Sequence, residues 1–389
     1  MGIQPVQDII DMVRGKETPF VLNWRSKKIQ NKYDFSPLKE AKSAIIFLVP
    51  TKNVVNGGVI SIFNLCRLSR DVAKNRVVLI ATYPGKFTYH KNDKFKNDEQ
   101  VYRFSQIVKY GKGLEELIIH VPEYYSEQFY SDLSVSEKKF LKSVRKLQIN
   151  IMNQNLLCMP TVCYLKKLYK LTDNVTQTTG FKRYSTQEIC NKFQMPLYYV
   201  SPLNNLENAC VKKEFGEKKK IILYSPDSQP LKPNILEHLK DNLPDFEFRM
   251  VEDLTYEEFL EAVSEAMFCV SFGEGFDGYY IPPYYSKSIG VAVYNDIFFP
   301  NPEIKSLPFV YKTYDDLRKK LPGDIKNVCG NKGEYERISE SSFAYIKQHA
   351  GNKEVTVSGL EKFYKGEATF IPNKAASDPI YAEDVNNQI

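Results

Sequence analysis

The sequence contains no hydrophobic run long enough to cross a membrane. Its longest apolar stretch, Ala44–Val49, has the length of a β-strand, whereas a membrane-spanning helix needs about 18 to 20 apolar residues. Near the N-terminus, Gln7, Asp8 and Asp11 interrupt the segment in which a secretory signal peptide requires unbroken apolar residues. We therefore expect a protein that stays in the cytoplasm.

Residue patterns that bind metals are also missing. Cys158 and Cys163 are close in sequence, but neither a second cysteine pair nor a nearby histidine completes a zinc site. Cys66 and Cys269 lie within apolar segments, which is typical of small core residues. We therefore expect no bound metal and no cofactor.

The sequence lacks a concentrated block of basic residues. The formal net charge is only +6, and the basic residues occur in short, dispersed groups such as Lys166–Lys167 and Lys218–Lys220. Nucleic-acid-binding domains usually carry a basic stripe and a pI above about 9, whereas the pI here is about 8.6. The charge argues against a nucleic-acid partner. It fits anionic small-molecule substrates, or a peripheral contact with an acidic membrane surface.

Two successive series of strand and helix patterns make up most of the chain. Alternation of this kind is typical of parallel α/β layers. The predicted strands are 44–49, 76–81, 117–121, 147–151, 175–179 and 197–200 in the first series, and 220–224, 246–251, 267–271 and 290–294 in the second. The predicted helices are 59–68, 136–146, 185–193, 233–243, 256–266, 284–287, 315–328 and 334–349, with a capping box at Ser185–Glu188. We therefore predict an α/β protein of two Rossmann-like domains that face each other across a cleft.

Composition suggests the domain boundaries. Pro202, two asparagine-containing turns and a charge cluster make the Ser201–Lys218 stretch typical of a linker. We predict an N-terminal extension, an N-terminal Rossmann-like domain, a C-terminal Rossmann-like domain, and a C-terminal tail that packs back on the N-terminal domain. Their ranges are 1–42, 43–204, 205–350 and 351–389.

The most informative segment is Ser271–Gly278, which follows a predicted strand directly. Its three glycines let the backbone approach a ligand closely, and the helix after it offers free N–H groups to an anion. Glu274 stands at the end of the strand, where a carboxylate accepts hydrogen bonds from a sugar or ribose hydroxyl. A glycine turn with a capping acid has the same composition, so the segment taken alone leaves both interpretations open.

In its context the segment resembles the nucleotide-sugar loop of the family 4 glycosyltransferases. These are retaining enzymes of the GT-B fold, in which a strand is followed by Ser-x-x-Glu-Gly-Phe-Gly. Ser271, Glu274, Gly275 and Phe276 match this pattern, Gly273 lies within it, and the strand 290–293 matches the one that follows in the family. The likeness covers about thirty residues closely. It implies a GT-B fold with the nucleotide-sugar bound by the C-terminal half.

The sequence departs from the family pattern after Phe276. The family has a second glutamate on the next helix, which holds the ribose, whereas the expanded segment Asp277–Tyr285 contains no glutamate. The hydroxyl of Tyr284 or Tyr285 is a candidate substitute, and packing is the alternative role for both.

The resemblance also implies groups around the diphosphate. Gly57 and Gly58 resemble the family's Gly-Gly loop, which approaches the transferred sugar and the diphosphate. Ser225 and Lys232 follow the first strand of the C-terminal domain, where the family places an arginine and a lysine. Lys232 occupies the lysine position, and no basic residue occupies that of the arginine. Lys287 is a candidate for the second positive charge, or else lies on a solvated helix start.

Candidates for the acceptor side follow the strands of the N-terminal domain. His120 ends a predicted strand just before Glu123, so both are candidates to face the cleft. His120 is the candidate catalytic residue, with a structural role as the alternative. Asn153–Asn155 and Thr178–Gly180, with Thr179 among them, also end strands of this domain, and Arg183 lies nearby. We expect them to bind acceptor hydroxyls or to satisfy the loop backbone.

These observations predict a glycosyltransferase that moves a sugar from a nucleoside-diphosphate sugar to a glycan or lipid-linked glycan. The resemblance implies retention of configuration and a role in bacterial surface-polysaccharide biosynthesis, such as O-antigen or capsule. No Asp-x-Asp occurs, so we expect Lys232, Glu274 and helix dipoles to act without a metal. The basic helix 136–146 is a candidate for a peripheral contact at the inner face of the membrane, and a solvated charged face is the alternative.

Two other functions fit parts of the sequence. A non-catalytic GT-B-like protein that binds a glycan or a partner transferase would explain the missing second glutamate and the missing arginine. A Rossmann-type oxidoreductase needs Gly-x-Gly-x-x-Gly after its first strand, and Gly57–Gly58 lacks that spacing.

Overall fold

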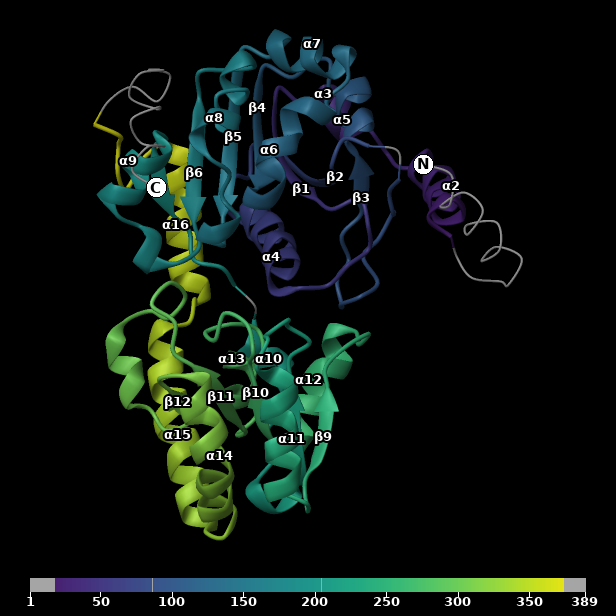
Figure 1. Ribbon diagram of the computed structural model, residues 1–389. Helices are drawn as coiled ribbons and strands as arrows, with labels where there is room; N and C mark the ends of the chain where they lie inside the picture. Colours follow the sequence, from purple (N-terminus) through teal and green to yellow (C-terminus); the bar gives the residue numbers. More distant parts are fainter. Residues whose placement is uncertain (1–17, 86, 204, 374–389) are drawn as a thin grey trace.

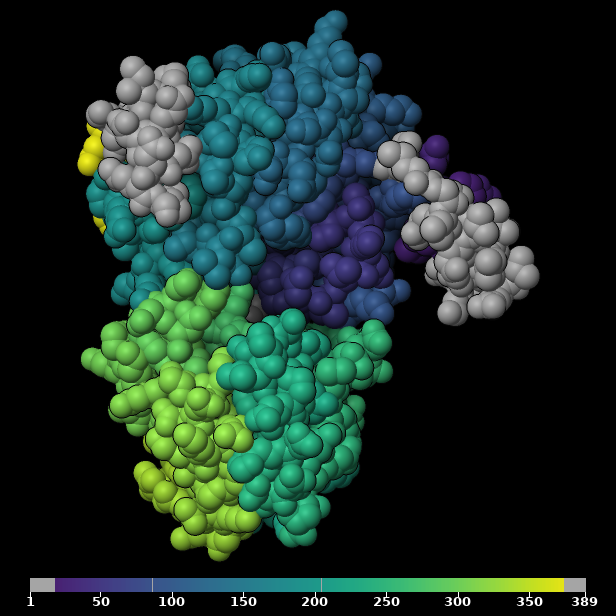
Figure 2. Space-filling view, viewed as in Figure 1, coloured from purple at the N-terminus to yellow at the C-terminus, as the bar shows by residue number. Residues whose placement is uncertain are grey.

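The computed structural model describes residues 18–85, 87–203 and 205–373, which form two lobes, each built on one parallel β-sheet (Figure 1). A space-filling view shows the two lobes in contact at a waist (Figure 2). The polar segment around Gln7–Asp11 and residues 374–389 of the predicted tail lie outside the described residues. None of the helices in the described ranges is long and apolar enough to cross a membrane.

The N-terminal lobe contains a seven-stranded sheet in the order β3-β2-β1-β4-β5-β6-β7. All of its strand pairs are parallel, which requires a crossover connection between consecutive strands. The central strand β1 is apolar at nearly every position, because helices cover both faces of a parallel sheet. The strands are β1 (Ser43–Val49), β2 (Val77–Thr82), β3 (Val101–Arg103), β4 (Glu116–Pro122), β5 (Lys146–Asn153), β6 (Val175–Thr179) and β7 (Leu197–Tyr199).

Helices pack on both faces of this sheet and give two separate cores. They are α2 (Pro19–Gln30), α3 (Ser36–Glu40), α4 (Gly57–Val72), α5 (Phe104–Tyr110), α6 (Glu123–Asp132), α7 (Val135–Ser143), α8 (Val162–Leu165) and α9 (Gln187–Phe193), with short 3₁₀ turns at Leu156–Cys158, Leu168–Lys170 and Lys182–Tyr184. The predicted capping box at Ser185–Glu188 is wrong by one residue. Helix α9 begins at Gln187, and the hydroxyl of Thr186 accepts a hydrogen bond from the Ile189 amide.

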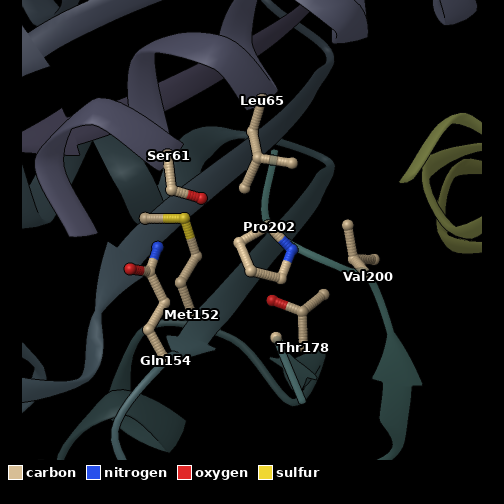
Figure 3. A pocket seen from close by; sticks show the side chains of 8 residues that line it. Ser61, Leu65, Met152, Gln154, Thr178, Val200 and Pro202 are labelled. Atoms are coloured by element: carbon tan, nitrogen blue, oxygen red, sulfur yellow. The ribbon is translucent and has the colours of Figure 1, made fainter. Parts of the chain in front are cut away.

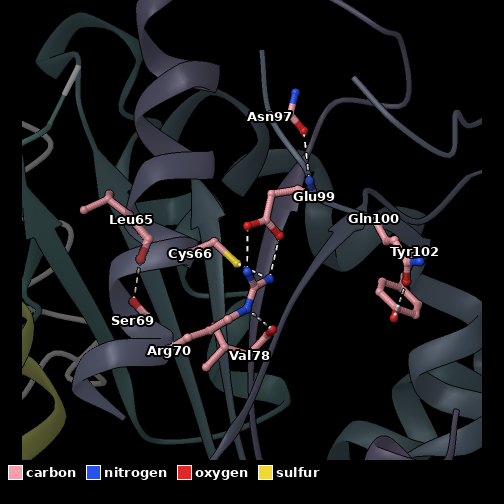
Figure 4. A network of polar contacts seen from close by, with 9 residues as sticks. All are labelled: Leu65, Cys66, Ser69, Arg70, Val78, Asn97, Glu99, Gln100 and Tyr102. Atoms are coloured by element: carbon pink, nitrogen blue, oxygen red, sulfur yellow. Dashed lines mark hydrogen bonds and ion pairs between the residues drawn. The ribbon is translucent and has the colours of Figure 1, made fainter. Parts of the chain in front are cut away.

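A partly buried ion pair holds helix α4 to the segment that precedes β3 (Figure 4). Arg70, near the end of α4, makes two hydrogen bonds of 2.6 Å to the two carboxylate oxygens of Glu99. Its Nε also donates to the Val78 carbonyl of β2 at 3.2 Å. Paired contacts of this kind fix orientation as well as distance. The ion pair therefore fixes the C-terminal end of α4. Through the helix it also positions the start of α4, which lies at the waist.

The C-terminal lobe contains a five-stranded parallel sheet in the order β12-β11-β10-β8-β9. Its strands are β8 (Lys219–Tyr224), β9 (Glu247–Met250), β10 (Ala266–Val270), β11 (Ile289–Val293) and β12 (Val310–Tyr311). Its helices are α10 (Leu206–Ala209), α11 (Lys232–Asn242), α12 (Tyr256–Glu265), α13 (Ile281–Tyr285), α14 (Tyr314–Cys329) and α15 (Lys332–His349), with 3₁₀ turns at Phe215–Glu217 and Pro302–Ser306. The two predicted Rossmann-like layers are thus confirmed.

The chain crosses the waist a second time before its last helix, α16 (Lys353–Lys365). Leu360 and Phe363 of α16 belong to the core that α4 forms against the N-terminal sheet. The hydroxyl of Tyr364 donates to Ser69 of α4 at 2.7 Å. Figure 1 shows α16 lying along the N-terminal lobe although α15 belongs to the other. The chain therefore connects the two lobes at two places.

Candidate functional site

The carboxyl ends of the two sheets meet at the waist. Strand β4 leads directly into Glu123, and β5 ends just before Asn155, while β10 of the other lobe leads into the loop that contains Glu274. The Asn155 amide donates to Glu123 Oε1 at 2.9 Å, and its side-chain Nδ2 donates to Glu274 Oε1. We call Glu123, Asn155 and Glu274 the junction triad. Ligands of open α/β sheets bind at this edge of the strands.

The two acids of the junction triad hold protons more tightly than ordinary carboxyls. Burial raises the pKa of Glu123 to about 7, and the nearby Glu274 adds to the effect. Burial also raises the pKa of Glu274 to about 7, with further contributions from Asp277 and Asp227. Perturbed carboxyls in a ligand-binding edge are typical of functional sites. Near neutral pH, each group can therefore change its charge when a ligand arrives.

Asp277 organises the loop that presents Glu274. One of its carboxylate oxygens accepts hydrogen bonds from Ser271 Oγ at 2.6 Å and from the Gly275 amide at 3.2 Å. The other accepts from the amides of Tyr279 and Tyr280, at 2.8 and 3.1 Å. Asp277, which stands where the family has a glycine after Phe276, therefore holds the loop in its conformation through these four hydrogen bonds.

Lys232 lies beside this loop, at the carboxyl end of β8. Its ammonium group donates to the carbonyls of Ser225 and Asp227 at 2.6 and 3.1 Å. The same group sits over the ring of Phe272, 5.5 Å from the ring centre. Burial lowers the pKa of Lys232, and Asp227 partly opposes the effect. The lysine is therefore oriented by carbonyls at the strand ends, where an anionic group of a ligand would meet it.

The Gly57–Gly58 pair begins helix α4 on the N-terminal side of the waist. A Cβ at Gly58 would lie 2.9 Å from Gln154 Oε1, whereas one at Gly57 would meet nothing within 4 Å. Gln154 and Ser61 point into a cavity of about 20 Å³ just behind this turn (Figure 3). A ligand pocket for a drug-sized molecule measures about 300 Å³ or more, so this cavity accommodates roughly one water molecule.

Further contacts join the lobes on either side of the triad. Arg183 donates to the Phe299 carbonyl at 2.8 Å, and the Tyr184 hydroxyl donates to the Ile297 carbonyl at 2.7 Å. On the other side the Lys96 amide donates to Glu257 of α12 at 2.7 Å. The predicted acceptor residue Arg183 therefore lies at the waist, but its guanidinium already binds the opposite lobe.

His120 does not reach this edge, so its predicted position is corrected. The side chain is 2% exposed and stacks on Phe47, with ring centres 4.2 Å apart, while Phe363 of α16 covers it. Its Nδ1 lies 3.0 Å from the Asn150 amide. Burial lowers its pKa to about 3, which leaves the ring neutral. The imidazole is part of the core between β4 and α16.

Lys287 is also misplaced by the sequence interpretation. It immediately precedes β11, and the start of a parallel strand lies at the edge of the sheet opposite to the carboxyl ends. Its ammonium group pairs with Glu214 instead, and its backbone is left-handed with a φ of +58°. The predicted second positive charge beside the Glu274 loop therefore does not come from Lys287.

Four other predicted residues are buried, and three of them contact neighbouring protein groups. Ser225 accepts a hydrogen bond from the Phe272 amide at 2.9 Å, and Phe276 packs on Tyr280 and Phe299. Thr179 Oγ1 donates to the Phe181 carbonyl at 3.3 Å. Asn153 has no hydrogen-bond partner for either side-chain atom. The protein interior therefore surrounds all four side chains.

The structure singles out two residues that the sequence had named only among several strand-end candidates. Glu123 and Asn155 come just after strands β4 and β5, so the strand-end rule that selected Asn153 and Thr179 had included them as well. Asp227 follows β8 in the same way, and a Cβ on Gly273 would approach its carboxylate to 2.6 Å. The pairing across the waist, in contrast, has no local sequence signal.

Comparisons with known proteins address the arrangement of the lobes. No family model and no curated protein sequence matches the chain. TarM superposes on 84% of the chain, over 99% of its own length, with a TM-score of 0.55 and 11% identity. The chain has the GT-B fold. An alpha-glucosyltransferase (AGT) in complex with UDP gives a TM-score of 0.53 at 11% identity, covering 83% of this chain and 99% of its own.

A sucrose-phosphate synthase (tll1590) from Thermosynechococcus elongatus matches the GT-B fold of this chain equally well. Its TM-score is 0.52 at 12% identity, over 83% of this chain and 98% of the synthase. At such identities the likeness concerns the path of the backbone. The predicted GT-B fold is confirmed, and the roles of individual site residues remain predictions.

Proposed function

We propose that this GT-B protein is a glycosyltransferase that binds a nucleoside-diphosphate sugar at the junction triad and transfers the sugar to a glycan or lipid-linked glycan. The similar solved structures include an alpha-glucosyltransferase in complex with UDP. Transfer with retention of configuration, without a metal and within surface-polysaccharide biosynthesis is the finer form of the proposal. The family 4 resemblance of Ser271–Phe276 supports that form.

The observation that supports the proposal most directly is the junction triad itself. It brings a carboxyl from each lobe to the carboxyl ends of both sheets, and Asn155 bridges them. Sugar hydroxyls both donate and accept hydrogen bonds, so they match a carboxylate on one side and an amide on the other. A donor sugar would replace the direct contact between Asn155 and Glu274.

The diphosphate of the donor would lie between Lys232 and the start of α4. Helix N-termini carry partial positive charge and unpaired amides, and α4 presents its own at Gly57–Gly58. Lys232 supplies a full charge from the other lobe. Both groups stabilise the charge that develops on a leaving nucleoside diphosphate. Equal transfer in the presence of a chelator and of added Mg²⁺ or Mn²⁺ would support the metal-independent form.

A nucleotide screen by thermal shift tests the proposal. UDP, GDP, CMP and dTDP, each with its common sugar-linked forms, are added to the wild type, Glu274→Ala and the control Glu237→Ala. Glu237 is exposed on α11 of the same lobe. A ligand at a hundred times its Kd stabilises the fold by about 2.7 kcal/mol, which gives a measurable shift.

We expect one nucleotide class to raise the wild-type and Glu237→Ala midpoints, and its sugar-linked form to lose its additional effect in Glu274→Ala. Hydrolysis or transfer from that donor would then establish catalysis. A nucleotide-sugar that binds without any turnover would favour the alternative, a non-catalytic GT-B-like protein. The absence of a glutamate from Asp277–Tyr285, where the family has its second one, is the observation that keeps this alternative open. No shift with any nucleotide would contradict the proposal.

A further inference from the structure

Helix α2 buries polar residues and exposes aromatic ones. Its polar residues Ser26 and Gln30 are fully buried, and Gln30 donates to the carbonyls of Tyr89 and Val101 at 3.0 and 2.8 Å. Its aromatic residues face outward instead, with Phe20 63% and Trp24 58% exposed. A surface helix normally buries its apolar face. Among the described residues, none covers the aromatic side chains of α2, so we infer a contact outside the chain.

Buried polar contacts hold α2 rigidly in this orientation. The Arg103 guanidinium donates to the Gln30 side chain at 2.7 Å and to the Asn23 side chain and carbonyl, each at 2.9 Å. Figure 1 shows α2 at the outer side of the N-terminal lobe, beyond the edge strand β3. Because buried polar groups are costly to separate from their partners, the helix cannot easily turn its aromatic face inward.

Positive charge accompanies the exposed aromatic residues. Between Thr18 and Tyr33 the chain has four basic residues and no acidic residue. Phe20, Trp24, Lys27 and Lys28 fall on one side of the helix at 100° per residue, and all four are exposed. The Lys28 ammonium lies 5.7 Å from the centre of the Trp24 ring. We call these four residues the α2 face.

We propose that the α2 face docks the protein on the surface of a bilayer that contains anionic lipid. Aromatic residues insert at the boundary between headgroups and acyl chains, and lysines beside them pair with anionic headgroups. The charge of the face is complementary to such a surface. The contact is peripheral, and it places the N-terminal lobe, on which the acceptor would bind, against the membrane.

The sequence had offered the basic helix 136–146, which corresponds to α7, as a candidate for this contact, with a solvated charged face as the alternative. Helix α7 shows no comparable face: its exposed apolar residue is Val135, and Lys138 is placed over the ring of Tyr130, 4.5 Å from its centre. Figure 1 shows α7 at the end of the N-terminal lobe far from the C-terminal lobe. Helix α7 therefore provides a control with the same kind of charge.

Trp24 makes the proposal directly measurable, because it is the only tryptophan in the chain. Its fluorescence is recorded while the full chain is titrated with phosphatidylcholine vesicles or with vesicles of phosphatidylcholine and phosphatidylglycerol. We expect a blue shift and co-sedimentation with the anionic vesicles, and neither with phosphatidylcholine alone. Added salt should weaken the binding, because it screens exposed charges. Co-sedimentation without a blue shift would overturn the proposal.

Substitutions test whether the α2 face makes the contact with the membrane. Phe20→Ser and the double variant Lys27→Gln/Lys28→Gln keep Trp24 as the reporter, and the exposure of these side chains leaves the fold intact. Each neutralised lysine removes about 1 kcal/mol of attraction, so the double variant should bind roughly 30-fold more weakly. The control Lys138→Gln/Lys139→Gln on α7 should bind as the wild type does.

Loss of binding in the α7 variant, with none in the α2 variants, would overturn the proposal. Vesicle binding requires no donor, so this result is separate from that for the proposed function.

Discussion

At the scale of single residues, the protonation of Glu274 decides what the waist can bind. Burial, Asp277 and Asp227 raise its pKa to about 7. The carboxyl is therefore largely neutral at pH 6 and largely ionised at pH 8. A hydrogen bond to an ionised carboxylate is roughly twice as strong as one between neutral groups. A sugar hydroxyl should consequently be held more tightly as the pH rises.

We therefore expect the affinity for the nucleotide-sugar, relative to the nucleotide alone, to rise about three- to tenfold between pH 6 and pH 8. Glu274→Gln keeps the shape of the side chain and removes its titration, so it should abolish this dependence. Isothermal titration calorimetry with both ligands measures the ratio. A wild-type ratio that does not change with pH would mean that Glu274 does not contact the sugar.

Two residues show why side-chain identity alone did not locate the site. His120 was expected at the waist because it ends a strand, but alternate residues of a strand face opposite sides of the sheet. Its side is covered by Phe363 of α16, a helix that begins more than 200 residues later. Lys287 could have been excluded from the sequence, since it precedes a predicted strand rather than following one. The triad residues that do meet, Glu123 and Asn155, follow their strands.

At the scale of elements, the loop between β10 and α13 depends on one glycine. Gly275 has a φ of +89°, and a Cβ there would lie 2.3 Å from Phe299 Cε2. The backbone conformation and the contact both exclude a side chain. Phe299 belongs to the core of the C-terminal lobe. An added methyl group would have to displace either the loop or this core.

We expect Gly275→Ala to destabilise the C-terminal lobe by about 2 to 4 kcal/mol. Gly278→Ala, three residues along the same loop, is the matched control, because a Cβ there meets nothing within 4 Å. Urea unfolding of both variants, followed by circular dichroism, measures the difference. Equal midpoints for the two variants would show that the loop tolerates a side chain at position 275.

Most strands and helices were predictable because each has a local pattern of apolar residues. Strand β1 is one example: its apolar run, covered on both faces, was sufficient to place it. The edge strand β3 has only three residues and was not predicted. Helix α16 was expected only as a tail, because its partners Ser69 and Tyr198 lie far away in the sequence. Local patterns do not encode which distant surface a helix covers.

At the scale of the whole molecule, few polar contacts join the lobes among those described above, and the junction triad is the one that brings two carboxyls together. Two carboxyls with raised pKa values face each other there across Asn155. Glu274 of one lobe contributes to the raised pKa of Glu123 on the other, so the contact between the lobes favours the protonated form. The stability of the closed arrangement relative to separated lobes is therefore fully present at low pH and is lost as the pH rises through about 7.

Asn155→Asp tests this coupling, because it places a third carboxyl between Glu123 and Glu274. Above pH 7, three like charges should repel and separate the lobes, whereas protonation at about pH 5 should restore the closed arrangement. We expect the radius of gyration from small-angle X-ray scattering to rise between these two conditions, and by more than in the wild type. Asn155→Ala removes the bridge without adding charge, so its change with pH should not exceed that of the wild type. If Asn155→Asp stays as compact as the wild type at about pH 8, the remaining contacts of Arg183 and Tyr184 must hold the lobes together without the triad.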